Sequence, residues 1–247
     1  MNILAVDSAT FTASVAVISE DAVLAERSIG SSRMHSGILA PMMQGVLNDA
    51  GLKPEDIGLF AVAVGPGSFT GLRIGISLIK AMSYALDKPA VGIPTLDSLA
   101  YNVFPTGYLV CPLMNARNSQ VFSAVYRCGN DGLVKLTDYM AVHISEIAAV
   151  AQDLEGDMLF TGDAAMLHKQ YLEKELAGRC HFANSAMSIN RASSVALLAR
   201  GKALSNEVGT CFDLLPFYMR KPQAERLRDD RDICRRDMRG VRDGSVG

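Results

Sequence analysis

Blocks of apolar and polar positions predict three strands followed by a helix at the start of the chain. The runs "ILAVDSA", "SVAVIS" and "VLAERSI" are apolar or β-branched and are separated by short polar stretches, which is the pattern of an antiparallel meander. Residues 35–51 then carry apolar side chains at helical spacing. Ser36 can cap this helix, Gly51 can end it, and Pro41 restricts how far upstream its regular part can begin.

The remaining pattern predicts that this order is used twice. A buried strand at 59–65, a helix of about five turns at 69–86 and a short strand at 89–94 complete the first set. The second set comprises three strands at 108–116, 120–128 and 133–142, a helix at 144–152, a strand at 158–162 and helices at 164–178 and 192–206. A duplicated βββαβα order is the layout of two actin-like, ribonuclease-H-type lobes.

We place the lobes at residues 1–106 and 107–225, with the last segment of the second lobe able to return to the first. Residues 226–243 change composition sharply, since they hold seven Arg and five Asp and little that could enter a core. Residues 226–247 are therefore expected to form a solvated, flexible tail.

Composition limits the function classes. The 247 residues are 49% apolar and 20% charged with a formal net charge of −2, as expected for a well-packed soluble protein. A protein that grips nucleic acid alone normally has a basic surplus, so any RNA contact is expected to rely on a partner. The five scattered cysteines form no C-x-x-C pair. With no basic leader and no membrane-spanning stretch predicted, the expected location is the cytoplasm.

The string "GPGSFTGLRIG" at 65–75 packs four glycines into eleven positions. It lacks the lysine of a Walker loop, and Thr70 stands where the dinucleotide pattern needs its third glycine. Gly67, Gly71 and Gly75 are four residues apart, and a glycine inside a helix costs roughly 1 kcal/mol relative to alanine. Close approach of another backbone would compensate for that cost. The approaching backbone could belong to this chain or to a partner protein.

Candidate chemistry is sparse. Asp7, with Ser8 and Thr10, ends the first strand where actin-like ATPases place an acidic residue for metal-bound phosphate, although a lone Asp there more often caps the turn. Asn115 stands at the matching place in the repeat and is a weak metal ligand. The four histidines form no zinc motif, and there is no G-x-S-x-G elbow. We therefore expect no catalysis, cofactor or metal from the chain alone. An actin-like, nucleotide-dependent phosphotransferase is the alternative.

Together these motifs resemble the TsaB family of bacterial tRNA threonylcarbamoyladenosine biosynthesis proteins. The resemblance runs to about residue 225 and is carried by "ILAVDSAT", "RMHSGILAP", "GPGSFTGLRIG", "PTLDSLA" and "PFYMRKPQAE". It implies an actin-like (ASKHA) fold of two lobes. It also implies a non-catalytic subunit that supports the catalytic paralogue TsaD and works with the small ATPase TsaE, with tRNA contacted indirectly through the complex.

The resemblance further implies that the first two helices, near residues 36–50 and 69–87, form a bundle with those of TsaD. Paired methionines suit adaptable interfaces, which supports placing this contact surface on both helices. The residues expected to face the partner are Met42, Met43, Gly67, Gly71, Leu72, Gly75 and Ile79. The isolated chain could form a homodimer through the same surface. Gly75→Leu is expected to abolish partner binding and leave the fold largely intact.

Two further comparisons with the family concern chemistry. The catalytic paralogue carries a metal-binding H-x-x-x-H pair after the glycine helix, whereas Thr95 and Leu99 stand at those places here. Neither side chain can replace histidine as a ligand. The second lobe of the family often begins with Asp-Ala-Arg, but this chain has Asn115, Ala116 and Arg117. This departure weakens a nucleotide or metal role for Asn115.

Overall fold

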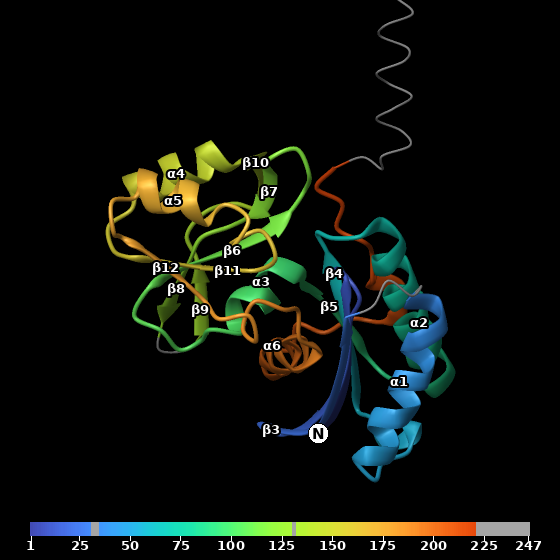
Figure 1. Cartoon of the computed structure of the whole chain (residues 1–247). Coiled ribbons are helices and arrows are strands. Elements are labelled where there is room, and N and C mark those ends of the chain that lie inside the picture. Colours follow the sequence, from blue (N-terminus) through green and yellow to red (C-terminus); the bar gives the residue numbers. More distant parts are fainter. Residues whose placement is uncertain (31–34, 130–131, 221–247) are drawn as a thin grey trace, which may run out of the picture.

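The computed structural model describes residues 1–30, 35–129 and 132–220, which form two lobes side by side (Figure 1). The sheet of the first lobe contains β1 (Asn2–Asp7), β2 (Thr12–Ser19), β3 (Ala22–Gly30), β4 (Leu59–Gly65) and β5 (Ala90–Pro94). Its strand order is β3-β2-β1-β4-β5. The first three strands pair antiparallel, and β4 and β5 extend the sheet in parallel from β1.

Helices cover both faces of this sheet. One face packs against α1 (His35–Asp49) and α2 (Phe69–Leu86), and the other packs against α6 (Ala192–Leu204) (Figure 1). Strands β1 and β4 are therefore buried along almost their whole length, which explains why their sequences are continuously apolar rather than alternating. Short 3-10 turns lie at Pro54–Asp56 and Cys211–Asp213. The helix α1 runs through Pro41 without ending there.

The second lobe repeats the topology of the first. Its main strands are β6 (Leu109–Asn115), β7 (Gln120–Ser123), β10 (Met140–His143), β11 (Met158–Thr161) and β12 (Cys180–Phe182). Their order, β10-β7-β6-β11-β12, matches that of the first sheet, again with three antiparallel strands followed by two parallel ones. The duplicated actin-like order predicted from the sequence is confirmed.

Several predicted boundaries in the second lobe are wrong. The runs at 120–128 and 133–142 each divide, giving an extra hairpin of β8 (Tyr126–Gly129) and β9 (Gly132–Lys135). The first run divides because the Val125 N–H donates to the side chain of Thr137, at 3.0 Å from its Oγ1, and not to the backbone of a neighbouring strand. The strand β12 and the helix α3 (Thr95–Tyr101) were not predicted.

The helix expected at 164–178 is shorter than predicted. It forms only as α5 (Lys169–Glu175), since the Ala164 N–H donates to the Leu113 carbonyl of β6 at 3.1 Å and ties the preceding segment to the sheet. The helix α4 (Ile144–Asp153) starts where the sequence predicts.

The second sheet also has two buried faces, which follow from the alternation of β6. Leu109, Cys111 and Leu113 of β6 pack with α4 and α5, whereas Val110 packs on the opposite face with Ala100 of α3. Successive side chains of a strand point to opposite faces. The helix α3 follows the last strand of the first lobe, so it links the first lobe to the core of the second.

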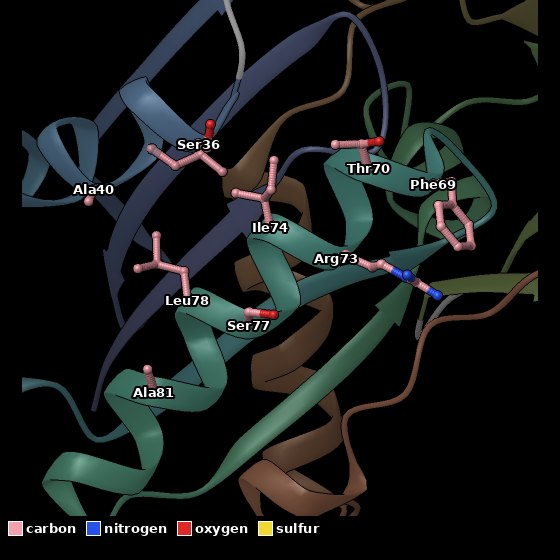
Figure 2. A pocket seen from close by; sticks show the side chains of 10 residues that line it. Ser36, Ala40, Phe69, Thr70, Arg73, Ile74, Ser77, Leu78 and Ala81 are labelled. Atoms are coloured by element: carbon pink, nitrogen blue, oxygen red, sulfur yellow. The ribbon is translucent and has the colours of Figure 1, made fainter.

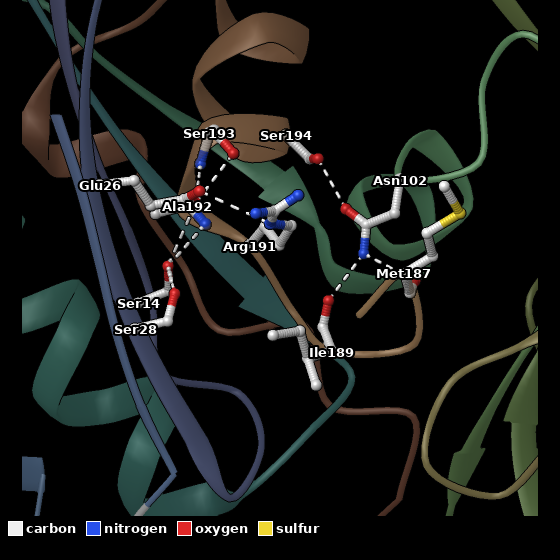
Figure 3. Close-up of polar contacts among 10 residues, drawn as sticks. All are labelled: Ser14, Glu26, Ser28, Asn102, Met187, Ile189, Arg191, Ala192, Ser193 and Ser194. Atoms are coloured by element: carbon white, nitrogen blue, oxygen red, sulfur yellow. Dashed lines mark hydrogen bonds and ion pairs between the residues drawn. The ribbon is translucent and has the colours of Figure 1, made fainter. Parts of the chain in front are cut away.

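A polar network fixes the start of α6 to the first lobe (Figure 3). The Ala192 N–H donates to Ser14 Oγ at 3.0 Å, and both the N–H and the hydroxyl of Ser193 donate to Glu26 Oε1, at 3.0 and 2.8 Å. Free N–H groups at a helix start need acceptors, and a carboxylate there also complements the helix dipole. On the other side, the Ser194 hydroxyl donates to Oδ1 of Asn102, the C-cap residue that follows α3, at 2.7 Å.

A second polar cluster joins α3 to the hairpin of the second lobe. Asp97 Oδ1 accepts hydrogen bonds from Tyr126 Oη at 2.7 Å and from Tyr139 Oη at 2.8 Å. The pKa of both phenols is raised above the usual value for tyrosine. Burial is the largest cause, and the charge of Asp97 is the second. Both tyrosines therefore stay protonated in the folded protein at pH values where unfolded tyrosine ionises.

The raised pKa values predict a loss of stability in alkali. Below the unfolded tyrosine pKa of about 10, the two tyrosines are protonated in both the folded and the unfolded state. Their full contribution to the free energy of unfolding is then present. Above that pKa the unfolded state gains by ionising, so the free energy of unfolding falls as pH rises. Tyr126→Phe should cost about 1–3 kcal/mol at pH 8 and flatten the decline above pH ~10, measured by urea unfolding.

Tyr171→Phe is the matched control, since Tyr171 Oη has no hydrogen bond in the described part of the chain. If the free energy of unfolding fell equally with rising pH in the wild type and in Tyr126→Phe, this account of the Asp97 cluster would be contradicted.

Candidate functional site

The glycine string lies against the first turn of its own lobe. A side chain at Gly71 would collide with the Ser8 carbonyl oxygen, and one at Gly75 would collide with the Ser8 hydroxyl. A side chain at Gly67 would likewise meet the Ala9 carbonyl. Two hydrogen bonds hold the contact, from Ser68 N–H to Ala9 O at 2.7 Å and from Ser8 Oγ to Gly71 O at 2.8 Å. The close approach is therefore between α2 and the β1–β2 turn within this chain.

This placement corrects the residue set expected to face a partner. Met42 and Met43 are each 4% exposed, and Leu72 and Ile79 are fully buried. All four belong to the core between the helices and the first sheet. Gly75→Leu would consequently damage the lobe itself, so it cannot report on partner binding as expected from the sequence.

The opposite face of the same two helices carries a groove of about 650 Å³ (Figure 2). Ile74 and Leu78 point from α2 towards α1, where Ala40 lies across from them. The groove is lined by Ser36, Leu39, Ala40, Phe69, Thr70, Arg73, Ile74, Ser77, Leu78 and Ala81. Apart from Arg73 this lining is uncharged, which is unusual for an exposed helix face.

Small side chains make the groove shallow at its centre. Ala40, Ser77 and Ala81 are exposed, whereas Ile74 and Leu78 are half-buried. Small residues allow a second helix to approach closely, and the flanking aliphatic side chains supply apolar area for it to cover. The arrangement suits the docking of helices better than the binding of a small molecule, which needs a deep cavity with convergent polar groups.

The other flank of α2 is bordered by an aromatic cluster. Arg73 points away from α1 towards Phe69 (Figure 2), with its Cζ 3.8 Å from the centre of the Phe69 ring. Its Nε donates to Tyr218 Oη at 2.9 Å, and the rings of Phe69 and Tyr218 stack at 4.9 Å. No local sequence pattern predicts this cluster, because Tyr218 is 145 positions from Arg73.

The place where actin-like ATPases hold phosphate is filled by the chain itself. Asp7 is fully buried; its Oδ2 accepts from Asn190 Nδ2 at 3.1 Å and its Oδ1 from the Ala9 N–H at 2.9 Å. Ser8 is also buried and bonded to α2. The hydroxyl of Thr10 lies 3.5 Å from the Thr12 carbonyl in the same turn. Asp7 thus joins the first lobe to the segment leading into α6.

Asn115 lies at the end of β6 in the second lobe and is exposed. Its side chain accepts from the Arg117 N–H at 2.8 Å, and its N–H donates to Asp163 Oδ1 at 2.9 Å. Burial raises the pKa of Asp163, although the backbone donors Asn115 and Ala164 partly offset this rise. The structure therefore bonds Asn115 to residues of its own lobe.

The positions of the paralogue's histidine pair are structural here. Thr95 is buried and its Oγ1 accepts from the Gly65 N–H at 3.1 Å, and Leu99 is 1% exposed. Across the described residues, no three His, Cys, Asp or Glu side chains gather in a way that could hold a metal ion. Within the same residues no helix combines the length and apolar character needed to cross a bilayer.

Comparison with known proteins identifies the family. The family model for TsaD, described as tRNA N6-adenosine threonylcarbamoyltransferase, matches residues 25–227. The tRNA threonylcarbamoyladenosine biosynthesis protein TsaB of Bacillus subtilis is 32% identical over 225 residues, which is 91% of this chain and 96% of the relative. The chain belongs to the TsaB family. The TsaB protein of Escherichia coli is 32% identical over 66% of this chain and 71% of its own length.

A solved structure supports the fold. A Pseudomonas aeruginosa protein with similarity to peptidase YeaZ superposes with a TM-score of 0.77 at 23% identity, covering 89% of this chain and 99% of the other. The actin-like, two-lobed architecture of this TsaB family member is thus shared with that protein.

The glycine contact predicts opposite effects for two glycine-to-alanine changes in helices. Gly71→Ala should lower the free energy of unfolding by about 1–3 kcal/mol, because the new methyl group collides with backbone. Gly201→Ala in α6 meets nothing within 4 Å, so helix propensity should raise stability by up to ~1 kcal/mol. Urea unfolding monitored by circular dichroism measures both. A stable Gly71→Ala variant would refute the close contact with Ser8.

Proposed function

We propose that this protein acts in the biosynthesis of threonylcarbamoyladenosine in tRNA, as a non-catalytic subunit that docks on the catalytic protein TsaD through α1 and α2. The observation that carries this proposal is the groove of about 650 Å³ on the exposed side of those helices, whose lining is uncharged apart from Arg73. An apolar surface of this kind on a folded protein indicates a partner.

The names of the relatives supply the pathway. The Bacillus subtilis and Escherichia coli relatives are named as tRNA threonylcarbamoyladenosine biosynthesis proteins. The match to the TsaD family model over residues 25–227 supports descent from the same ancestor as the catalytic enzyme. Two homologous proteins can pair through equivalent helices.

The surroundings of Asp7 support a role without turnover. An actin-like phosphotransferase needs its first acidic residue free to work with metal-bound phosphate, whereas Asp7 is buried and bonded to Asn190. Replacing that bond would require the segment before α6 to move. The side chains of Thr95 and Leu99 are packed in the core, so the site of the paralogue's metal pair is filled by structural residues.

The proposal extends to the remaining partners. TsaE joins the complex, tRNA is reached through it, and the isolated chain can pair with a second copy through the same groove. The site of action is the cytoplasm, where tRNA is modified. Residues 226–247, expected to be a flexible tail, lie outside the described residues and are not assigned a role.

Ala81→Arg tests the groove, because an arginine side chain there would hold a docking helix away. We expect loss of measurable binding to purified TsaD in isothermal titration calorimetry. In cells depleted of the protein, we expect no recovery of threonylcarbamoyladenosine in nucleoside mass spectrometry of total tRNA. The wild type should restore the modification.

Ala149→Arg is the matched control, since Ala149 is also an exposed alanine on a helix, α4 of the second lobe. It should bind TsaD and restore the modification like the wild type. Undiminished TsaD binding by a folded Ala81→Arg protein would contradict the docking surface. ATP turnover by the purified chain alone would instead favour the phosphotransferase alternative.

A further inference from the structure

We infer that Arg73 is the charged anchor of the docking surface: it binds a carboxylate on a helix of the docked subunit and disfavours docking of a second copy. This inference rests on the proposed function and adds the chemistry by which the surface selects its occupant. Arg73 is the one charged residue among those that line the groove.

The guanidinium is held in place before any partner arrives. The Phe69 ring lies 3.8 Å beneath it and its Nε is engaged by Tyr218 Oη at 2.9 Å. Within the described chain, Arg73 has no acidic partner and its two Nη groups have no acceptor. An arginine whose side chain is already held in place loses little side-chain entropy on binding. Its two Nη groups can donate to the two oxygens of a carboxylate.

Tyr218 belongs to a segment that is itself tied to both lobes, which keeps the cluster rigid. The neighbouring Phe217 N–H donates to the Val64 carbonyl of β4 at 2.7 Å, and the Phe217 ring lies 5.4 Å from that of Tyr139 in the second lobe. Arg220 donates to the Ala116 and Ala141 carbonyls of the second lobe, at 3.3 and 3.4 Å. The anchor is therefore built jointly from α2 and this strap, defined here as residues 214–220.

The charges of the two helices argue against a second copy as the preferred occupant. The helix α2 contains no Asp or Glu, and the only one in α1 is Asp49 at its end. Asp49 is already paired with Arg27, at 2.7 Å. A symmetric dimer across the groove would thus bring basic helix faces together with no carboxylate from α1 or α2 to neutralise Arg73. A partner helix with an acidic residue beside its apolar face removes that penalty.

The test measures binding of purified TsaD from the same organism and self-association of the chain, for Arg73→Met and for the wild type. Arg73→Met should weaken TsaD binding about 10-fold at 50 mM NaCl and by much less at 500 mM NaCl, because exposed charge pairs are screened by salt. Sedimentation velocity should show stronger self-association of the variant, since removal of the like charges favours the symmetric dimer.

Two further variants separate charge from packing. Tyr218→Phe keeps the ring and the Arg73 charge but removes the Nε acceptor, so it should weaken TsaD binding by roughly 3-fold. Lys80→Met removes the other basic residue of α2. Lys80 does not line the groove, and its charge contributes to lowering the pKa of Asp213. This variant should leave the affinity within about twofold. An equal effect of Arg73→Met and Lys80→Met would show a general charge effect and overturn the anchor.

The outcomes also distinguish this inference from the proposed function. Loss of binding by Ala81→Arg with unchanged affinity of Arg73→Met at 50 mM NaCl would leave the docking groove standing and refute the anchor. If a folded Ala81→Arg protein binds TsaD normally, the proposed function itself fails. A 10-fold loss for Arg73→Met that does not depend on salt would refute carboxylate pairing.

Discussion

The structure of the first lobe depends on the contact between the glycine face of α2 and the β1–β2 turn. Because Gly71 and Gly75 have no side chains, the helix backbone lies directly on Ser8, whose hydroxyl donates to the Gly71 carbonyl at 2.8 Å. The contact sets the height and rotation of α2 over the sheet. Leu72 and Ile79 consequently enter the core, while Arg73, Ser77 and Ala81 face outward. The groove is a consequence of this seating, since an α2 lifted or rotated by a side chain would present another face.

The same turn connects the proposed docking surface to the segment that leads into α6. Asp7 directly precedes Ser8, and it is bonded to Asn190 just ahead of α6. The start of α6 is in turn fixed by Glu26 and Ser14 on one side and by Asn102 on the other (Figure 3). A position that holds phosphate in actin-like enzymes is here bonded to the segment that leads into α6.

The strap of residues 214–220 extends these fixed contacts to the groove. Tyr218 fixes Arg73, and Phe217 and Arg220 bond to the second lobe. The proposed docking surface is thus supported from both lobes even though its lining belongs to the first. In the proposed complex, little binding energy would be consumed in ordering this surface, which leaves more for affinity and for selection of the partner.

The sequence by itself determined the two-lobed architecture, the positions of α1, α2 and α6, and the family. Apolar periodicity and the string at 65–75 are local properties, so they can be read without the structure. The sequence also determined that the glycine face meets a backbone. Only the tertiary structure decided which backbone, and it placed Met42, Met43, Leu72 and Ile79 in the core. A helical period shows which residues share a face but not what that face contacts. Likewise, Asp7 meets Asn190 across 183 positions, and Arg73 meets Tyr218 across 145. Such pairings arise from the path of the whole chain, so no local pattern contains them.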